Sequence, residues 1–462
     1  MIKTVSNRKK AVLDMTRGKS LRLILIFAVP LFIGTVFQQV YNVVDTMVAG
    51  YCLGDQAIAA IGATGSLYGL IINLSWGLNS GFALVITRSF GARDIPKLRK
   101  TIAATLILGL GITTAMTAAA LIFLRPMMGL LHTPETIFDQ AYSYMIVICG
   151  GLIATVAYNT FAAIMRSFGN SRVPLYILIF SSLLNIGLDL LFVAVFEMGV
   201  AGAALATVLA QAISAIICGA YVIRNYQEYL PRRKDCRLEV GLIREMLSSG
   251  GAMAFMYSIV CIGSVFYQSA INALGEVIIT AHTASERIIH ILMGPLAALM
   301  DATSTFVGQN WGAGRIGRVK EAFRKSMLLE IVLGLTCCGL VYACGGQLIR
   351  LITGTKQADV LRYGVMNMRI VMPFFPVLGV LFILRTSMQA MGQKIVPVIS
   401  SVFELLMRVA GALWMVPELG YLGGCWNTPL TWSVMTMFIF IAYLVKTRKL
   451  LEDRAKHSMV GG

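Results

Sequence analysis

The sequence predicts an all-α integral membrane protein in which twelve transmembrane helices form two six-helix lobes, related by a pseudo-two-fold axis along the membrane normal. Three observations predict this fold class: the apolar composition, the placement of the basic residues and an internal repeat. Of the 462 residues, 57% are hydrophobic and only 13% are charged, whereas soluble proteins carry about 25% charged residues. This composition excludes a soluble enzyme, a nucleic-acid-binding protein and a disordered scaffold.

Twelve apolar segments are long enough to cross a bilayer as helices, which takes about 20 residues each. Charged, proline-rich and glycine-rich breaks give their approximate bounds: 22–48, 57–86, 98–123, 136–163, 173–195, 199–223, 244–272, 277–305, 326–348, 360–384, 395–415 and 419–445. Several segments are longer than a bilayer requires, which predicts tilted or kinked helices. Pro30 and Pro373 are the candidates for kinks.

The net charge of +17 is explained by membrane orientation. If the N-terminus lies inside, 32 of the 39 basic residues flank the spans on the inner side, 4 lie in outer segments and 3 lie within spans. Cytoplasmic loops of membrane proteins carry such an excess of Lys and Arg. We therefore expect a multi-pass membrane protein with both termini in the cytoplasm, and no nucleic-acid partner.

The chain aligns with itself when it is shifted by 221 to 223 residues. The clearest matches are pairs of glycines: Gly54 with Gly275, Gly169 with Gly392, and Gly199 with Gly420. A near-constant offset over half of the chain indicates duplication. We expect an N-lobe at 1–223, a cytoplasmic linker at 224–243 and a C-lobe at 244–462. Repeats of this kind occur in transporters whose lobes rock about a shared cavity.

Polar residues at membrane depth are costly, so each one is a candidate functional residue. In the first half they form helical stripes on spans 1, 5 and 6, and comprise Gln38, Asn42, Asp45, Ser182, Asn185, Asp189, Thr207 and Gln211. Asp45, Asp189 and Thr207 are expected at one level, roughly 7–12 Å below the outer surface. Two carboxylates beside an amide and a hydroxyl suit a hard cation such as Na⁺. They equally suit a shared proton, because two crowded carboxylates do not both ionise readily.

The repeat indicates that this ion site belongs to one lobe, because Phe266 and Ala412 occupy the positions equivalent to the two acids. The second half has a cluster of its own on span 8, formed by His282, Glu286, Arg287 and His290. No further ligands appear at a matching spacing, so we expect a buried pair or a substrate counter-charge rather than a metal site.

Three further polar features lie in the second half. Glu404 and Arg408, four residues apart on span 11, are expected to form a structural ion pair. Asp301 and Arg369 are isolated in the sequence and have no assigned role.

Four segments resemble the multidrug and toxic compound extrusion (MATE) transporters. They are PLFIGTVFQQVYNVVDTMVAG (30–50), MRSFGNSRVPLYILIFSSLLNIGLDLLF (165–192), GVAGAALATVLAQ (199–211) and FVGQNWGAGR (306–315). The resemblance extends from about residue 15 to 450. Within the family, the sequence is most similar to the DinF-type branch.

The resemblance implies a secondary active antiporter that exports amphipathic, mostly cationic compounds in exchange for H⁺ or Na⁺, without a cofactor and as a monomer. It assigns ion or proton coupling to Asp45, Asn185, Asp189 and Thr207, with Na⁺ as the only metal considered there. It also assigns Pro30 to a bend in helix 1 that accompanies protonation. Spans 7 and 10 lack the buried acids of the family's other bacterial branch, which leaves the first-lobe acids as the coupling candidates.

Two other functions remain to be weighed. A flippase for a lipid-linked precursor would come from the same wider superfamily, but such proteins often have extra helices and cavities lined with arginine. A membrane-embedded enzyme would need a nucleophile–base pair or a complete metal set, and only the span 8 cluster hints at one. The sequence does not distinguish H⁺ from Na⁺ coupling or name the exported compound.

Overall fold

The computed structural model describes residues 12–131, 133–237, 239–354 and 357–453, and these residues form helices joined by short connections, with no β-strand among them. Eleven of the helices are long and apolar enough to cross a membrane, or up to twelve if one bent pair is a single span. Each predicted span coincides with one helix or one interrupted helix, which confirms the all-α membrane fold. The helices extend beyond the apolar segments because their polar ends continue the same backbone hydrogen bonding.

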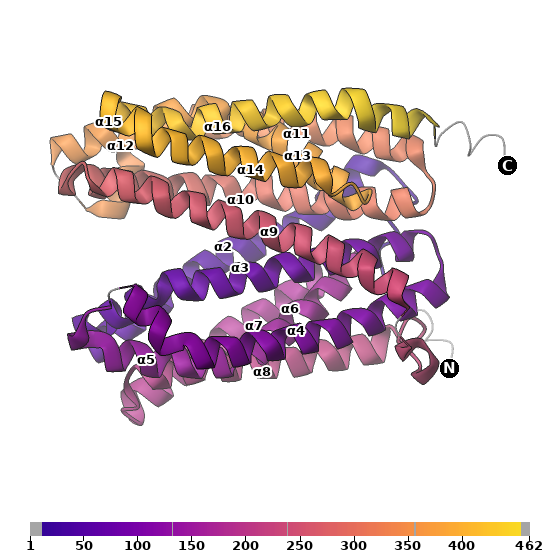
Figure 1. The fold of residues 1–462 in the computed structure, drawn as a ribbon, viewed down its shortest axis with the longest axis horizontal. Helices are drawn as coiled ribbons and strands as arrows, with labels where there is room; N and C mark the ends of the chain where they lie inside the picture. Colours follow the sequence, from indigo (N-terminus) through magenta and orange to yellow (C-terminus); the bar gives the residue numbers. More distant parts are fainter. Residues whose placement is uncertain (1–11, 132, 238, 355–356, 454–462) are drawn as a thin grey trace. The chain divides into compact units, whose positions relative to one another are not determined.

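The described chain divides into two compact units, which are described separately. Unit 1 comprises residues 1–14 and 33–254. It contains the later part of α2 (Ser20–Leu53), the first part of α9 (Val240–Asn272), and α3 (Asp55–Gly91), α4 (Ile95–Leu130), α5 (Glu135–Gly150), α6 (Leu152–Ser167), α7 (Arg172–Asp189) and α8 (Gly199–Asn225). Within unit 1, α8 packs against α5, α6 and α7, and these helices are labelled in Figure 1.

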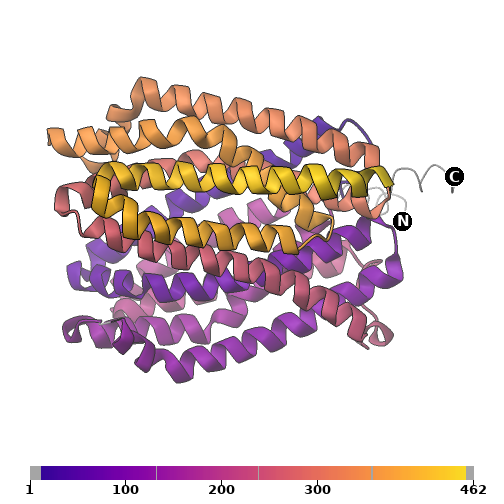
Figure 2. The ribbon, with the colours of Figure 1, turned by 45° about the horizontal axis from the view of Figure 1, so that its top comes forward.

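Unit 2 comprises residues 15–32 and 255–462. Its other helices are α10 (Glu276–Gly312), α11 (Ile316–Thr353), α12 (Ala358–Val371), α13 (Phe375–Ala390), α14 (Ile395–Ala410), α15 (Val416–Leu419) and α16 (Tyr421–Ala442). A 3₁₀ turn at Met372–Phe374 separates α12 from α13, so the break expected at Pro373 is present. The α16 helix, yellow in Figure 2, packs along α14.

The two units share two helices. The boundary between the units falls at 32/33 in α2 and at 254/255 in α9, positions that the repeat offset relates. The contact-based units thus assign residues 15–32, expected in the N-lobe, to unit 2, and residues 244–254, expected in the C-lobe, to unit 1. The sequence alone does not reveal this difference. The first part of α2 belongs to unit 2 and the first part of α9 belongs to unit 1, and only contacts in the structure show this.

The first part of α2 is held in unit 2 by side chains of the FVGQNWGAGR segment and the residues after it. Arg318 donates to the carbonyls of Met15 (2.9 Å) and Gly18 (2.7 Å). Asn310 also donates to Met15 O (3.1 Å), and Arg315 donates to Thr16 O (2.7 Å). This segment thus has a structural role in anchoring the start of α2.

The repeat is visible in the backbone. All six glycines of the matched pairs have positive φ: 81° and 97°, 81° and 89°, and 62° and 60°, a region in which only glycine is unstrained. A π-helix at Leu190–Val195 also recurs at Gly411–Met415. The duplication therefore extends to the irregular points of the helices.

The fourth predicted span is bent by 46° between α5 and α6. The bend lies at Gly150 and Gly151, a pair that weakens a helix. A Cβ at Gly151 would lie 2.2 Å from Val208 of α8, so glycine also allows these helices to approach closely.

Large apolar side chains lie exposed on several helices. Ile122, Ile216 and Trp414 are each 70% exposed. Soluble monomers rarely expose large contiguous apolar patches, whereas a bilayer covers them. The exposed side chains therefore agree with the membrane-spanning fold.

Candidate functional site

Two carboxyl groups meet within unit 1. Asp45 lies near the end of α2 and is half-buried, and Asp189 is the last residue of α7 and is 1% exposed. The π-helix begins immediately after Asp189, and such insertions often occur at functional sites. The two side chains line the same small cavity, and their carboxyl groups interact electrostatically. Because two carboxylates confined together repel each other, this arrangement favours protonation of one of them.

Asn185 and Thr207 complete this site. With the Asn185 amide oriented to satisfy its neighbours, Nδ2 donates to Asp189 Oδ2 (3.1 Å) and Oδ1 accepts from the Thr207 backbone N–H (3.0 Å). The Thr207 hydroxyl donates to Ala203 O (3.2 Å) within α8. The structure therefore brings together the four residues expected to bind the coupling ion, while their role in coupling stays a prediction.

Three tyrosines border the carboxyl pair and were missed in the sequence. The Tyr41 hydroxyl is hydrogen-bonded to the Asn185 amide, and Tyr68 and Tyr144 interact electrostatically with Asp45. The signal for Tyr41 was present, since it lies four residues before Asp45 on the same helical face. The other two lie on α3 and α5, and the sequence gives no indication that these helices converge here.

A small cavity adjoins the pair. It is lined by Asp45, Asp189, Tyr144, Thr207 and apolar side chains, and has a volume of about 10 Å³. This is close to the minimum that one water molecule needs. The cavity is therefore too small for an organic substrate.

The other polar residues expected near this site are more scattered. Gln38 and Asn42 are exposed and do not line the cavity. Gln211 is partly buried, and its Oε1 has no hydrogen-bond partner among the described residues. Pro30 lies inside α2, two residues before the unit boundary, and its role in a bend stays a prediction.

The span 8 residues do not form one cluster. His282 is buried, and its ring contacts Tyr421, with 3.3 Å between Nδ1 and the hydroxyl. Glu286 accepts from Asn367 (3.3 Å), while Arg287 and His290 are exposed. No group of three or more His, Cys, Asp or Glu side chains suited to a metal occurs among the described residues.

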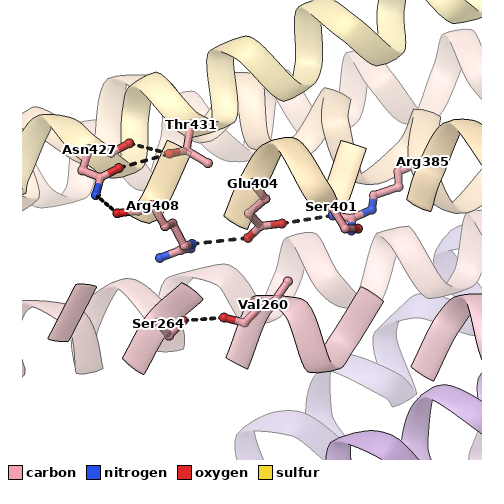
Figure 3. A network of polar contacts seen from close by, with 8 residues as sticks. All are labelled: Val260, Ser264, Arg385, Ser401, Glu404, Arg408, Asn427 and Thr431. Carbon is pink, nitrogen blue, oxygen red and sulfur yellow. Dashed lines mark hydrogen bonds and ion pairs between the residues drawn. The ribbon is translucent and has the colours of Figure 1, made fainter. Parts of the chain in front are cut away.

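The ion pair expected on span 11 is present and larger than expected. Glu404 lies 3.5 Å from both Arg408 Nε and Arg385 Nη1, and Arg385 also donates to Ser401 (Figure 3). Arg385 was expected in an inner connecting segment, but it lies within α13 and is 9% exposed. Sequence spacing finds the partner on the same helix but not one from a neighbouring helix.

Three ionisable groups in unit 2 have no part in these networks. Asp301 is exposed on α10, and Arg369 lies 5.7 Å from the ring centroid of Tyr342. Glu330 of α11 was missed in the sequence although it lies inside span 9. It is 0% exposed, and neither carboxyl oxygen has a hydrogen-bond partner among the described residues.

Several known proteins are similar to the chain. "Probable multidrug resistance protein YpnP" of Bacillus subtilis (strain 168) is 27% identical over 389 residues, which cover 82% of this chain and 84% of that protein. "Multidrug export protein MepA" of Staphylococcus aureus (strain NCTC 8325 / PS 47) is 20% identical, over 92% of this chain and 94% of that protein. A crystal structure of MATE in the bent conformation matches with a TM-score of 0.88 and 22% identity, over 96% of this chain and 98% of that one.

The family comparison also supports the internal repeat. The MatE family model matches twice, at residues 30–191 and 252–414, so the two matches are displaced by the offset that aligns the chain with itself. Together they cover well over half of the 462 residues. The chain belongs to the MatE family.

Proposed function

We propose that this protein is a secondary active antiporter that exports amphipathic, mostly cationic organic compounds by alternating access, driven by H⁺ or Na⁺. The family and the relatives named for multidrug resistance and export support the class of cargo. The placement of Asp45 and Asp189 in the lining of one small cavity is the observation that carries the coupling mechanism. The DinF-type branch belongs to the same proposal.

The geometry favours H⁺ as the coupling ion. Two carboxyl groups confined in one small cavity share a proton readily, because ionising both of them is unfavourable. The Asn185 amide also presents Nδ2 to Asp189, and an N–H donor does not coordinate Na⁺. Binding of Na⁺ would require the amide to turn and the cavity of about 10 Å³ to accommodate further oxygen ligands.

Deprotonation of the pair supplies a physical cause for a conformational change. Two carboxylates in a site of low dielectric repel each other strongly, and separating α2 from α7 relieves this repulsion. The α2 helix is continuous: its residues 20–32 belong to unit 2 and Asp45 belongs to unit 1. Movement at the carboxyl pair is therefore transmitted along this helix. We therefore place the coupling step in α2.

The test is dye efflux from proteoliposomes under an imposed ΔpH or an imposed Na⁺ gradient, applied separately. Asp45→Asn and Asp189→Asn each remove the shared proton and are expected to abolish ΔpH-driven efflux. Asp94→Asn is the matched control, because Asp94 caps α4 by accepting from Lys97 N (3.0 Å) and asparagine caps equally well. Full ΔpH-driven efflux by both site variants would refute the proposal, and efflux under the Na⁺ gradient alone would replace H⁺ with Na⁺.

The remaining parts of the proposal concern the setting of the protein. The distribution of basic residues supports the bacterial inner membrane with both termini in the cytoplasm, and the two-unit chain is proposed to act as a monomer without enzymatic activity. The flippase alternative has less support, since the buried Arg385 and the partly buried Arg408 both contact Glu404 rather than forming an open cationic surface for pyrophosphate.

A further inference from the structure

A second, larger pocket lies within unit 1. Its volume is about 310 Å³, enough for several water molecules. Its rim includes Asp139 and Met198, which are exposed, and its floor includes Ala57 and Val200, which are 3% and 6% exposed. The pocket thus leads from the surface of unit 1 into its interior.

This pocket leads toward the carboxyl pair. Residues of α2, α3, α5 and α8 line both the pocket and the small cavity beside Asp45 and Asp189. Along α3, Ala57 in the pocket is followed one turn later by Ile61 in the cavity, a rise of about 6 Å. On α5 the change occurs between neighbours, since Ser143 lines the pocket and Tyr144 lines the cavity.

Several polar groups of the pocket lack protein partners. Gln140 Oε1 is buried without a hydrogen-bond partner among the described residues, and no ion pair of Asp139 occurs there. The α8 helix starts at Gly199 with no side-chain cap, and its first residues, Gly199 to Ala201, line the pocket, where the first N–H groups of a helix are free to bind water. Acceptors and donors together are suited to hold a chain of hydrogen-bonded water, which conducts protons.

We propose that this pocket is the path by which the coupling cation reaches Asp45 and Asp189 from the outer side, separately from the exported compound, with Asp139 concentrating the cation at its mouth. The inference rests on the proposed function and on the orientation proposed with it. In this conformation Val48 and Ile61 line the inner cavity and limit its connection to the pocket. A carboxylate at the mouth of a cleft raises the local concentration of cations.

The first test fills the pocket chemically. In a Cys52→Ser background, which removes an exposed native cysteine at this end of α2, Ala201→Cys is treated from outside with a membrane-impermeant methanethiosulfonate in right-side-out vesicles. Gln56→Cys is the matched control, because Gln56 is exposed next to Ala57 but does not line the pocket. Labelling at 201 is expected to reduce ΔpH-driven efflux severalfold and to leave substrate counterflow, which needs no net cation movement, unchanged.

The outcomes separate the two proposals. Unchanged efflux after complete labelling at 201, or an equal loss of counterflow, would overturn the access path, while the Asp45 and Asp189 variants independently test the coupling site. If those variants retain full coupled efflux, the proposed function fails whatever the labelling shows.

The second test addresses Asp139. Asp139→Asn is expected to raise the external proton concentration for half-maximal efflux by about two- to fivefold at low ionic strength, and by less at high salt because of screening. Glu135→Gln, one turn earlier on α5 and outside the pocket lining, is the control. Equal effects of both variants, or no effect of Asp139→Asn, would remove Asp139 from the path.

Discussion

Glu330 offers a test of how the interior of unit 2 is stabilised. Its side chain is fully buried on α11 against Gly379 of α13, where a Cβ would lie 2.6 Å from Glu330 Cβ. Neither carboxyl oxygen has a hydrogen-bond partner among the described residues. The protein therefore retains a polar group where an apolar one of the same length would fit.

Glu330→Met keeps the unbranched shape and removes both oxygens. Each unsatisfied buried polar group costs about 1–3 kcal/mol, so the substitution is expected to stabilise the protein by about 2 kcal/mol or more. With about 2–4 °C per kcal/mol for a folding unit of 150–250 residues, the thermal midpoint in detergent should rise by about 4 °C or more. Scanning fluorimetry at fixed detergent and protein concentration measures this shift.

The control lies on the same helix and has the opposite expected sign. Glu321 accepts hydrogen bonds from Ser20 (2.7 Å) and Lys325 (2.6 Å), so Glu321→Met removes satisfied interactions and should lower the midpoint. A lower midpoint for Glu330→Met would refute the reasoning, because it would mean that the carboxyl group makes a net favourable interaction in the folded protein.

Three other substitutions test separate parts of the structure. Gly81→Ala places a Cβ 2.4–2.5 Å from the α9 backbone and should destabilise unit 1 by about 1–3 kcal/mol. At Gly109 an added Cβ meets nothing within 4 Å, so Gly109→Ala should stabilise α4 by about 0.5–1 kcal/mol. Thermal unfolding measures both effects. Glu404→Gln leaves the buried Arg385 and the partly buried Arg408 without a carboxylate and should cost about 3–5 kcal/mol. Glu452→Gln, in an exposed pair, should cost only about 0.5 kcal/mol, and no difference between the two variants would contradict the network around Glu404. Arg318→Gln removes the donors to the carbonyls of Met15 and Gly18 and should speed hydrogen–deuterium exchange of residues 15–20. An unchanged exchange rate would show that the bonds from Asn310 and Arg315 hold this segment without Arg318.

The sequence predicted the spans well because bilayer crossing has a direct signature of about 20 apolar residues. It also predicted the repeat, since glycines at positive φ are hard to replace and so preserve the register between Gly199 and Gly420. It did not predict the bend at Gly150 and Gly151, because a pair of glycines is compatible with both a straight and a bent span. The close approach of Gly151 to Val208 is likewise visible only in the structure.

The candidate site was predicted only in part, for a related reason. Asp45, Asn185 and Asp189 stand out because they are polar residues in apolar spans, and helical spacing places each on a definite face. Tyr68 and Tyr144 do not stand out, since tyrosine is common in membrane helices, and Arg385 was taken for a residue flanking a span. Assigning these residues requires the contacts between helices, which a single sequence does not contain.

The two halves differ at the positions proposed to bind the coupling ion. Both halves have a π-helix at the same point of the repeat, so the backbone irregularity at Asp189 does not itself define an ion site. The offset of 223 residues that relates Gly169 to Gly392 also relates Asn185 to Arg408 and Asp189 to Ala412. Arg408 contacts Glu404 at 3.5 Å, so the second half has an internal ion pair at the point where the first half has Asn185. This difference between the halves supports the proposal that the coupling site belongs to unit 1.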